Sequence, residues 1–354
     1  MAVVEHYRAL TRPAAPLVSV CIAHYKGPEL IAACLDSVLA QDCAFDVEII
    51  VHDDASLDDS VAFLRSNYPQ IELLVSHDNV GFCVANNRMV EHANGKYVLL
   101  LNNDAALFSD ALATLAEAAA GQNTPGILTL PQYDWESGDL VDLGCLLDPF
   151  YNPVPNLDPD RSEVAMVIGA CLWIGRDTWF DLGGFPDWFG SIGEDLYLCC
   201  AARLAGLPVQ SVQGSGYRHQ QGSSFGGNRA LKGRLNSNYR RRRFSERNKT
   251  FTLFVMTPTI IMWPLLSIHI IALVVEGLIF STVRRDLKAG INIYLNVLRE
   301  LTVERSVIGA ARSKHQAKRG ATLLNYTAPF RVLPHKLAML RKYGFPTLTQ
   351  NAKH

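Results

Sequence analysis

The feature that most constrains the fold is a short apolar run, Tyr97–Leu101, which ends abruptly in Asn102-Asn103-Asp104. The run is too short for a typical helix, so its pattern predicts a buried strand. In an open α/β sheet, ligands bind outside the carboxyl ends of the strands. A carboxylate at that edge is well placed to hold a divalent cation, but it is also a common capping or turn residue. The run alone leaves both interpretations open.

Strand and helix signals alternate along the first 120 residues. Strands are predicted at Leu17–His24, Val47–Val51, Ile71–Val75 and the Tyr97 run, with helices at Pro28–Leu39, Leu57–Arg65, Gly81–Ala93 and Ser109–Ala120. This order predicts an α/β fold with a Rossmann-like, mostly parallel sheet and helices on both faces. Beyond Pro125, strands are predicted at Val164–Ile174 and Val209–Tyr217, with helices at Asp177–Leu182 and Asp195–Ala205.

The charge of the 354-residue chain is distributed very unevenly. The net charge is −16 over residues 1–239, +4 over residues 240–283 and +11 over residues 284–354. We therefore expect a first domain over residues 1–239 and a basic, apolar, helical region over residues 240–354. A basic surface suits nucleic acid and anionic lipid about equally well. The choice between these partners depends on the segment between the acidic first domain and the basic tail.

That segment is the apolar stretch Phe251–Val283, which follows four consecutive arginines at residues 240–243. It is long enough to cross a bilayer once, but it contains two prolines, a histidine and a glutamate. A single span would export the basic tail, against the positive-inside tendency. A kinked helix pair lying in or dipping into the inner leaflet is expected, with the arginines at anionic headgroups. A buried helical hairpin is the alternative, and no nucleic acid partner is expected.

Cysteines and the N-terminus indicate the compartment. The eight cysteines lack CxxC metal spacing and several lie in apolar runs, which predicts a reducing compartment without a disulfide framework. The N-terminus lacks the basic-then-apolar form of a signal peptide. Together with the apolar stretch, this predicts a peripheral or monotopic protein at the cytoplasmic face of the inner or plasma membrane.

Five motifs occur in order along the chain. They are Val18–Tyr25 followed by Lys26–Leu30, Ile49–Ser60, Asn79–Asn87, Leu100–Asp104, and Gly183-Gly184-Phe185 with Gly193–Cys199. Together, from about Leu17 to Ser224, they resemble the family 2 glycosyltransferases, inverting enzymes of the GT-A fold. The rear half, with Arg247-Asn248 before the apolar stretch, is similar to rhamnosyltransferase-type members that build cell-surface polysaccharide.

The resemblance implies a site for a UDP- or dTDP-sugar. Its Asp-Asp-x-Ser turn places Asp53, Asp54 and Ser56 at the base and ribose, where a carboxylate can accept an imide N–H. Helix capping is the alternative role for these residues. The other residues that the resemblance places at the nucleotide sugar are His24, Gly81, Asn86, Asn87, Asn102 and Asn103. Glycine at position 81 would let the backbone approach closely, whereas ordinary helix packing is an equal alternative for Asn87.

The resemblance also implies a Mn²⁺ or Mg²⁺ cofactor. Asn102-Asn103-Asp104 corresponds to the Asp-x-Asp metal motif of the family, with Asn in the first place. Asp104 is then the direct ligand, and His219 matches a histidine after the last core strand that can complete the metal shell. Replacing one carboxylate by an amide weakens the charge of the site. A structural histidine is the alternative reading of His219.

Glu194-Asp195 matches the acidic pair at the start of the acceptor-site helix of the family. Inversion by a single displacement needs one base to deprotonate the acceptor hydroxyl. The resemblance implies that Asp195 is this base and that Glu194 orients it or binds the acceptor. An acidic pair at a helix N-terminus also complements the helix dipole, which is the alternative role. Gly169, Ala170 and Trp188 correspond to acceptor-side positions.

The working hypothesis is a metal-dependent, inverting transferase that moves a sugar to a hydroxyl of a glycan or polyprenyl-diphosphate-linked acceptor at an anionic membrane. The main rival is a non-catalytic partner subunit of the same fold in a membrane glycan-assembly complex, which Asn102 favours. A sugar nucleotidyltransferase agrees less well with the sequence, because Ala23–Gly27, after the first predicted strand, is not the Gly-rich loop of such enzymes. Ile291–Arg305, an amphipathic tail helix, could support a homo-oligomer or pack on the core.

Overall fold

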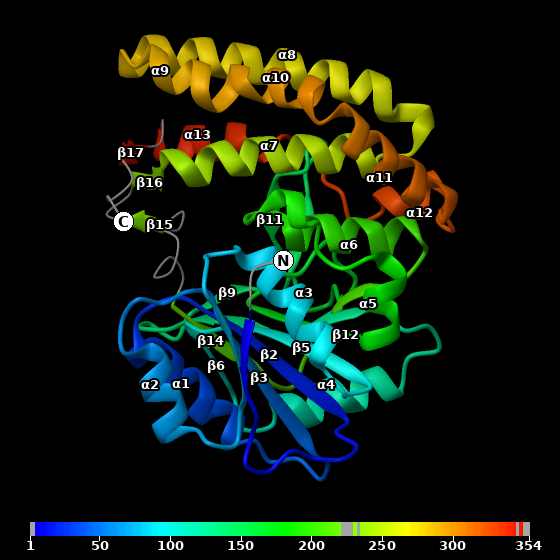
Figure 1. Cartoon of the computed structure of the whole chain (residues 1–354). Helices are drawn as coiled ribbons and strands as arrows, with labels where there is room; N and C mark the ends of the chain where they lie inside the picture. Colours follow the sequence, from blue (N-terminus) through cyan, green and yellow to red (C-terminus); the bar gives the residue numbers. More distant parts are fainter. Residues whose placement is uncertain (1–3, 221–228, 232–233, 345–346, 350–354) are drawn as a thin grey trace. The chain divides into compact units, whose positions relative to one another are not determined.

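The computed structural model describes the chain except for residues 1–3, 221–228, 232–233, 345–346 and 350–354 (Figure 1). The chain forms two compact units. The first comprises Met1–Cys145, Pro155–Leu198 and Leu207–Gln221, and the second comprises Leu146–Val154, Cys199–Gly206 and Gly222–His354. The predicted site residues all fall within the first unit. No disulfide joins the eight cysteines, all of which lie in described segments.

The first unit is built on an eight-stranded sheet with the order β1-β4-β3-β2-β5-β12-β7-β13. The strands are β1 (Val4–Tyr7), β2 (Val18–His24), β3 (Val47–Asp53), β4 (Glu72–Ser76), β5 (Tyr97–Asn102), β7 (Ile127–Thr129), β12 (Cys171–Gly175) and β13 (Val209–Ser211). Strands β4, β3, β2 and β5 run parallel, whereas β1 and β12 run antiparallel to their neighbours. The prediction of a mostly parallel α/β sheet is confirmed.

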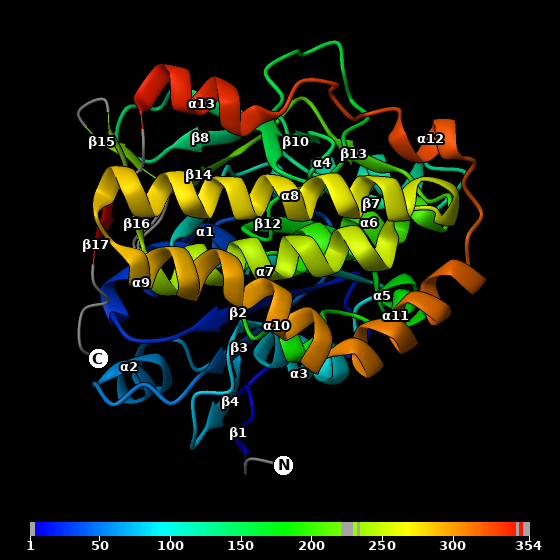
Figure 2. The same cartoon turned by 90° about the horizontal axis from the view of Figure 1, so that it is seen from above.

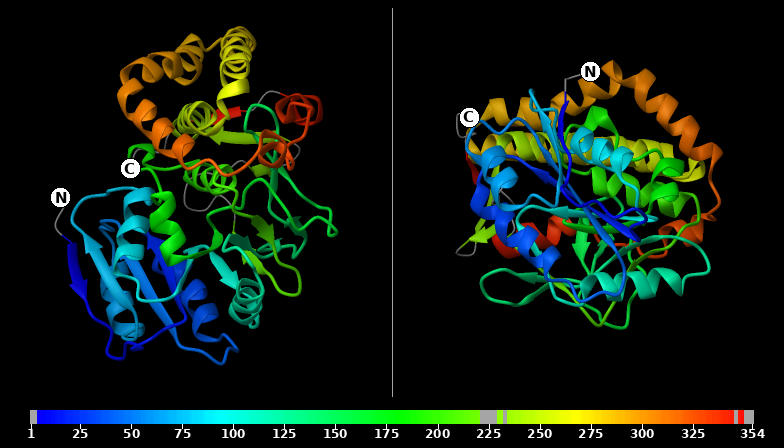
Figure 3. Two further views of the ribbon diagram at one scale, coloured as in Figure 1. Left: turned by 90° about the vertical axis from the view of Figure 1, so that its right-hand side faces the viewer. Right: turned by 60° about the horizontal axis from the view of Figure 1, so that its bottom comes forward.

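Both faces of this sheet are covered, which explains why its strands are apolar without alternation (Figure 3). The flanking helices are α1 (Pro28–Leu39), α2 (Ser60–Asn67), α3 (Phe82–His92) and α4 (Ala111–Ala120). Val20 and Ile22 of β2 share one apolar cluster with residues of α1, α2 and α4. Cys21, between them, points to the other face and is equally buried, and α3 packs against β2 and β3. Helix α1 begins and ends where the sequence predicts.

The strand order creates a topological switch at β2. From β2 the chain continues through β3 and β4 on one side, and then returns to β5 on the other. The register pairs His24 with Asp53 and Ala23 with Asn102, so these strands end together at one edge. In α/β sheets the ligand crevice lies at such a switch point, outside the carboxyl ends of the strands.

A second sheet continues from this edge, with the order β6-β14-β8-β9. Its strands are β6 (Ala105–Leu107), β8 (Gln132–Asp134), β9 (Leu140–Asp142) and β14 (Tyr217–His219), and two further short strands are β10 (Cys145–Leu147) and β11 (Pro153–Pro155). Strand β6 starts directly after Asp104, and His219 pairs with Ala105. This register brings His219 beside Asp104, although the two residues are 115 positions apart in the sequence.

Two predicted strands are wrong in extent. Val164–Ile174 forms a strand only from Cys171, because Cys171 N–H bonds back to Ile168 O in a turn at 3.2 Å. Val209–Tyr217 is divided into β13 and the start of β14, because Gly214 adopts a φ of 100° and turns the chain.

The second unit is mainly helical. It contains α7 (Tyr239–Met256), α8 (Thr259–Arg284), α9 (Leu287–Ala289), the π-helical turn η2 (Gly290–Leu295), α10 (Asn296–Val303), α11 (Arg305–Ala317), α12 (Leu323–Thr327) and α13 (His335–Tyr343), with short strands β15 (Arg229–Leu231), β16 (Arg234–Asn238) and β17 (Thr347–Thr349). The apolar stretch Phe251–Val283 is broken at Thr257-Pro258 into the end of α7 and nearly all of α8. Helices α7, α8 and the α9–α10 segment lie side by side (Figure 2).

Buried ion pairs hold this unit together. Glu246 of α7 is 2% exposed and contacts Lys249 at 2.7 Å and Lys336 of α13 at 2.6 Å. Lys336 also reaches Glu276 of α8 at 2.6 Å, and Glu276 in turn binds Arg242 at 2.6 Å. Burial alone would raise the pKa of Glu246, but the three cations outweigh it and hold the pKa well below its ordinary value. The cluster therefore ties α7, α8 and α13 through charges that depend on one another.

Candidate functional site

Two interlocked turns form the edge of the sheet beyond β2 and β3. Lys26 N–H donates to Ser56 Oγ at 2.8 Å, and Gly27 N–H donates to Asp58 Oδ2 at 3.0 Å. Lys26 and Ala55 both have left-handed φ angles, of 60° and 62°, which are costly for residues other than glycine. Ser56 thus braces the neighbouring turn, and α2 begins later, at Ser60. The strain is concentrated where the sequence predicts the nucleotide.

The two carboxylates of the predicted nucleotide turn have different environments. Asp54 accepts the N–H groups of Val80 and Gly81 at 2.7 and 2.9 Å, so it fixes the loop that leads into α3. Asp53 is fully buried, and its Oδ1 accepts Ser56 N–H at 2.9 Å. Its Oδ2 has no hydrogen-bond partner among the described residues. Burial raises the pKa of both carboxyls. Asp53 therefore retains an acceptor for a ligand N–H or O–H.

His24 supplies a buried donor at the same edge. Asn103 Nδ2 donates to His24 Nδ1 at 3.0 Å. Burial lowers the pKa of His24 to about 4, so the ring is neutral near pH 7 and carries its proton on Nε2. Nε2 is buried and has no partner within the described part of the chain. A buried imidazole N–H of this kind is costly unless a bound ligand or water accepts it.

Asp104 and His219 face each other across the second sheet. Their Oδ1 and Nε2 atoms lie 3.1 Å apart, and both side chains are buried. His219 Nδ1 donates to Gln132 Oε1 at 3.3 Å, and Tyr217 O–H donates to the same oxygen at 2.8 Å. With the proton on Nδ1, the Nε2 lone pair is directed at the carboxylate, whereas a proton on Nε2 donates to Asp104 Oδ1. Either a proton or a metal cation between them would stabilise the arrangement.

Asp104 and His219 fit a Mn²⁺ site in which the substrate supplies the remaining ligands. Among the described residues, no three His, Cys, Asp or Glu side chains converge on one point. The chain therefore supplies one carboxylate and one imidazole, and diphosphate oxygens and water would supply the remaining ligands, as at many nucleotide-bound cations. A mixed oxygen and nitrogen set suits Mn²⁺ better than Mg²⁺. The backbone N–H of Asn102 donates at 3.1 Å to the carbonyl oxygen of Ala170, the residue before β12, so the first position of the motif is fixed by this segment.

Gln132 and Asp142 are site residues that the sequence analysis did not identify. They pair with each other between β8 and β9. Gln132 orients His219 by the hydrogen bond described above. Burial raises the pKa of Asp142 to about 7, with a smaller opposing effect from His219. Neither residue stands in a motif, and only the folding of the second sheet brings them close to His219.

Gly81 lies against the segment that leads to the acidic pair. Its φ of 85° requires glycine, and a Cβ added there would lie 3.0 Å from Gly190 O. The same carbonyl accepts Cys83 N–H at 3.2 Å. The backbone neighbour of Gly81 in this structure is therefore the 187–190 turn. A role at the nucleotide remains a prediction.

The two asparagines of α3 make contacts within the protein. Asn87 Nδ2 donates to Phe185 O at 2.8 Å and to Asp187 Oδ1 at 2.7 Å, and its Oδ1 accepts Phe185 N–H at 3.0 Å. Asn86 Nδ2 donates to Phe82 O at 2.9 Å. Asn87 thus clamps the 185–187 segment onto α3. Both amides therefore have partners within the protein. Their contact with a nucleotide stays a prediction.

Glu194 and Asp195 begin helix α6 (Glu194–Leu204) after a strained turn. Ile192 and Gly193 have φ angles of 72° and 87°, and a β-branched residue is rare in this region. Asp195 Oδ2 accepts Gly169 N–H at 3.1 Å. Residues 169 and 170 lead into β12, whose antiparallel pairing with β5 places them at the Asn102 edge of the sheet. The structure therefore brings Asp195, Gly169 and Ala170 to the edge that carries Asp104.

Trp188 lies in the short helix η1 (Asp187–Phe189), which follows α5 (Arg176–Leu182). Its half-buried ring packs edge-on against Phe189 and Tyr197, with ring centroids 4.7 and 6.1 Å away. Tyr197 belongs to the first turn of α6, so the ring is fixed beside the acidic pair. This position is compatible with the predicted acceptor side.

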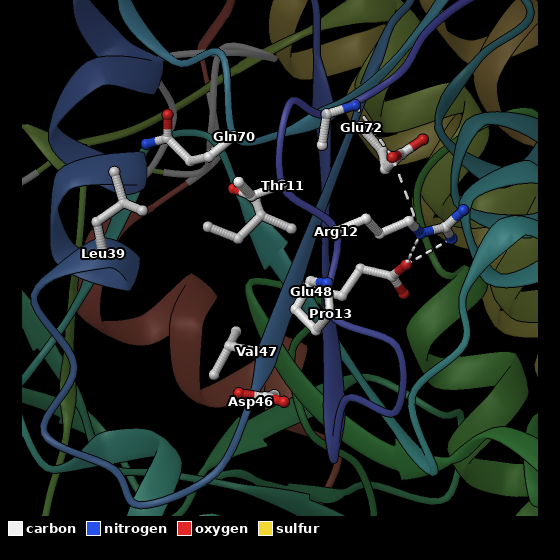
Figure 4. A pocket seen from close by; sticks show the side chains of 11 residues that line it. Thr11, Arg12, Pro13, Leu39, Asp46, Val47, Glu48, Gln70 and Glu72 are labelled. Atoms are coloured by element: carbon white, nitrogen blue, oxygen red, sulfur yellow. Dashed lines mark hydrogen bonds and ion pairs between the residues drawn. The ribbon is translucent and has the colours of Figure 1, made fainter.

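A surface hollow of about 350 Å³ lies elsewhere, at the amino ends of β3 and β4 (Figure 4). Arg12 crosses it to form ion pairs with Glu48 at 2.5 Å and Glu72 at 3.8 Å. Glu48 also accepts Ser19 O–H and Asn94 N–H at 2.5 and 2.9 Å. These contacts explain the buried carboxylates as structural ties. The hollow contains none of the predicted site residues.

Comparison with known proteins supports the pattern of the first motifs. Residues 19–141 match the family model described as Glycosyl transferase family 2. Chondroitin synthase of Escherichia coli is 32% identical over 111 residues, which cover 30% of this chain and 16% of the relative. The uncharacterized glycosyltransferase YibD of Escherichia coli K12 is 34% identical over 105 residues, 29% of this chain and 30% of the relative. A PGL/p-HBAD biosynthesis glycosyltransferase of Mycobacterium bovis BCG is 34% identical over 119 residues, 32% and 46% of the two chains.

In each of these relatives the matched stretch spans less than half of the protein. Solved structures share the fold over a longer range. GalNAc-T7, crystallised with UDP, GalNAc and Mn²⁺, superposes with a TM-score of 0.55 at 15% identity, over 69% of this chain and 48% of that one. Staphylococcus aureus TarS gives a TM-score of 0.51 at 15% identity, over 88% and 54%. The family match includes Asp53, Asp54 and Asp104 but ends before Glu194 and His219.

Proposed function

We propose, from the premise that residues 19–141 form a glycosyltransferase family 2 domain, that the chain transfers a sugar from a UDP- or dTDP-sugar to a hydroxyl of a glycan or lipid-linked glycan acceptor. The observation that carries the proposal is the facing pair Asp104 and His219, 3.1 Å apart at the carboxyl edge of the sheet. GalNAc-T7, which shares the fold, is crystallised with UDP and Mn²⁺, which supports a nucleotide and a divalent metal as ligands of the proposed enzyme.

The donor would bind at the ends of β2 and β3. Asp53 offers one buried carboxylate oxygen without a partner, and His24 offers one buried N–H without a partner, both within the described residues. A uracil or thymine base presents an imide N–H and carbonyl oxygens, which complement this acceptor and donor. The turn held by Ser56 and Asp58 would enclose the ribose, and the loop fixed by Asp54 would bring the Gly81 backbone toward the diphosphate.

Asp104 and His219 would hold the metal. When bound, the cation neutralises the charge that develops on the leaving diphosphate. Gln132 keeps the His219 ring turned so that Nε2 is available to it. Asn102 contributes no charge, so the site carries one carboxylate fewer than an Asp-x-Asp pair, and metal affinity should depend strongly on His219.

Asp195 would act as the base that takes the proton from the acceptor hydroxyl as the sugar is displaced with inversion. Its carboxylate is oriented by Gly169 N–H, and it lies on the first turn of α6, whose backbone dipole stabilises the anion. Glu194 would orient the acceptor or Asp195. Trp188 provides an aromatic face beside them, a surface on which sugar rings commonly pack.

A non-catalytic partner subunit of the same fold is the second candidate, favoured by Asn102 at the first position of the metal motif. The test is a panel of UDP- and dTDP-sugars with Mn²⁺ or Mg²⁺, scored by thermal shift and by released nucleoside diphosphate. A metal-dependent shift with turnover of one donor supports the transferase. Binding without release of diphosphate supports the donor site and leaves the acceptor to be identified, whereas no shift with any donor, in folded protein, supports the non-catalytic partner subunit.

We place the reaction at the cytoplasmic face of a membrane, in the synthesis of a cell-surface polysaccharide. The support is the apolar helix α8, which is long and apolar enough to cross a bilayer, together with the net charge of +11 over residues 284–354. A polyprenyl-diphosphate-linked acceptor would meet the enzyme there. A rhamnosyl donor, suggested by the likeness of the rear half to rhamnosyltransferase-type enzymes, is one dTDP-sugar to include in the panel.

A further inference from the structure

Helix α8 has two chemically different faces. Met262, Leu266, Leu273 and Phe280 lie on a buried stripe with the three- and four-residue spacing of one helix face. The opposite face is apolar and exposed. Its most exposed large side chains are Ile260 (75% exposed), Trp263 (62%), Ile268 (55%), Ile271 (63%) and Leu278 (61%). Soluble monomers rarely leave an apolar strip of this length uncovered, so something in the cell covers it.

The ionisable residues of α8 before Arg284, His269 and Glu276, lie on its inner side. His269 is 2% exposed, and its Nε2 is 2.8 Å from Thr250 Oγ1 of α7. Glu276, the one charged residue of α8 before Arg284, is bound by Arg242 and Lys336. A helix that crossed a bilayer as a single span would leave these contacts or carry their charged partners into the hydrocarbon, which is costly. The packing of α8 on α7 therefore favours a helix that stays with its unit.

The neighbouring helices extend the same surface and give it a basic border. Figure 2 shows the α9–α10 segment beside α7 and α8. It adds exposed Leu287 and Ile291, 67% and 46% exposed. Exposed cationic residues occur close by in sequence: Arg285 directly after α8, Lys288 in α9, Arg299 in α10 and Arg305 at the start of α11. An apolar strip bordered by arginine and lysine matches the boundary between acyl chains and anionic headgroups.

We infer that α8 lies in the plane of a membrane, with its outer face inserted into one leaflet that contains anionic lipid, and does not cross the bilayer. The inference rests on the membrane location of the proposed function and defines its geometry. At about 39 Å, a 26-residue helix is as long as a bilayer is thick, so length alone fits either orientation. The inner-face contacts and the uncharged outer face select the in-plane one. Residues after α8 then stay on the same side of the membrane as the site.

The first test is flotation of the full chain with vesicles of phosphatidylcholine alone or mixed with phosphatidylglycerol. The test variant is Ile271→Glu with Leu278→Glu, which places two charges on the outer face. The matched control is Leu157→Glu, because Leu157 is also exposed (59%) but lies in the first unit. We expect binding that is stronger with phosphatidylglycerol, at least about tenfold weaker in the double variant, and unchanged in the control.

The second test is sidedness. An epitope tag after residue 354 is probed with protease in sealed inside-out membrane vesicles from cells that express the chain. The in-plane helix predicts a tag that is cleaved without detergent, whereas a protected tag would show a spanning helix and overturn the inference. No flotation, together with dimers that the double variant dissociates, would assign the face to a second copy and also overturn it.

Thermal stabilisation by UDP or dTDP with Mn²⁺ is measured on the same three proteins. It should be equal in all of them, because the changed residues are remote in sequence from the nucleotide motifs and exposed. Loss of this stabilisation in every protein, with flotation intact, would refute the proposed transferase and leave the in-plane helix standing. Intact stabilisation without lipid binding would refute the in-plane helix and leave the proposed transferase standing.

Discussion

Replacing Asp195 by Asn tests the proposed base with a minimal change of shape. The amide of Asp195→Asn keeps an oxygen that can accept Gly169 N–H, a bond of 3.1 Å in the structure. The variant loses only the negative charge in the first turn of α6, which is worth about 0.3–1 kcal/mol at an exposed helix N-terminus. Because Asp195 is half-buried and not fully buried, we expect the free energy of unfolding to fall by no more than about 1 kcal/mol.

The effect on catalysis should be much larger. A positioned general base contributes roughly 10²–10⁴-fold to the rate, and a neutral amide cannot take the acceptor proton. This range corresponds to about 3–5 kcal/mol of activation free energy. The assay compares kcat for donor turnover with an excess of acceptor, and the dissociation constant of the donor without acceptor. We expect kcat to fall by at least about 100-fold while donor affinity changes by less than about twofold.

Asp177→Asn is the matched control. Asp177 is also an acidic residue in the first turn of a helix, α5, and it is exposed. It should lose a similar fraction of stability and no activity. The reasoning would be refuted if Asp195→Asn lowered kcat no more than Asp177→Asn did. It would also be refuted if donor binding and the free energy of unfolding fell together with activity, because Asp195 would then be a structural residue.

Three further predictions concern charge. Burial raises the pKa of Asp142 from 3.8 to about 7, so between these pH values the folded chain binds more protons than the unfolded chain, and the free energy of unfolding falls as the pH rises. Asp142→Asn should remove this fall. In urea denaturation, the free energy of unfolding of the variant relative to wild type should therefore be a few kcal/mol higher above about pH 7 than below pH 3.8. Glu246→Gln removes the carboxylate partner of Lys249 and one of the two carboxylate partners of Lys336, and it should cost about 3–5 kcal/mol, read from the unfolding of the helical unit. A loss under about 1 kcal/mol would contradict the buried cluster. His219→Gln should raise the Mn²⁺ concentration for half-maximal activity by roughly 10–100-fold, and an unchanged value would exclude His219 as a ligand.

The sequence was sufficient to predict the elements whose signals come from neighbouring residues. The apolar runs of β2, β3 and β5 and the Pro28 start of α1 predict elements that lie within a residue or two of the observed bounds. These signals depend on the periodicity of neighbouring residues, which a single sequence contains. The polar residues at the ends of the three strands then follow from the sheet, because parallel strands in register end at one edge.

The sequence was insufficient where distant segments pair. The antiparallel β12 and the second sheet depend on short strands of three to five residues, too short for a periodic signal. For that reason Gln132 and Asp142 could not be recognised, and the extents predicted for Val164–Ile174 and Val209–Tyr217 were wrong. The internal contacts of Asn87 were equally hidden, since its partners at 185 and 187 lie about a hundred residues away in the chain.

The most direct test of the proposed reaction is the release of nucleoside diphosphate by wild type and by Asp104→Ala, each with and without Mn²⁺, using the donor that gives the largest thermal shift. Asp104 lies at the switch point of the sheet and faces His219, so its loss should remove the metal-dependent rate. We predict release by wild type that requires Mn²⁺, and a rate in Asp104→Ala at least about 100-fold lower with the variant still folded. Equal rates in the two proteins, or release by wild type that does not depend on metal, would contradict the account.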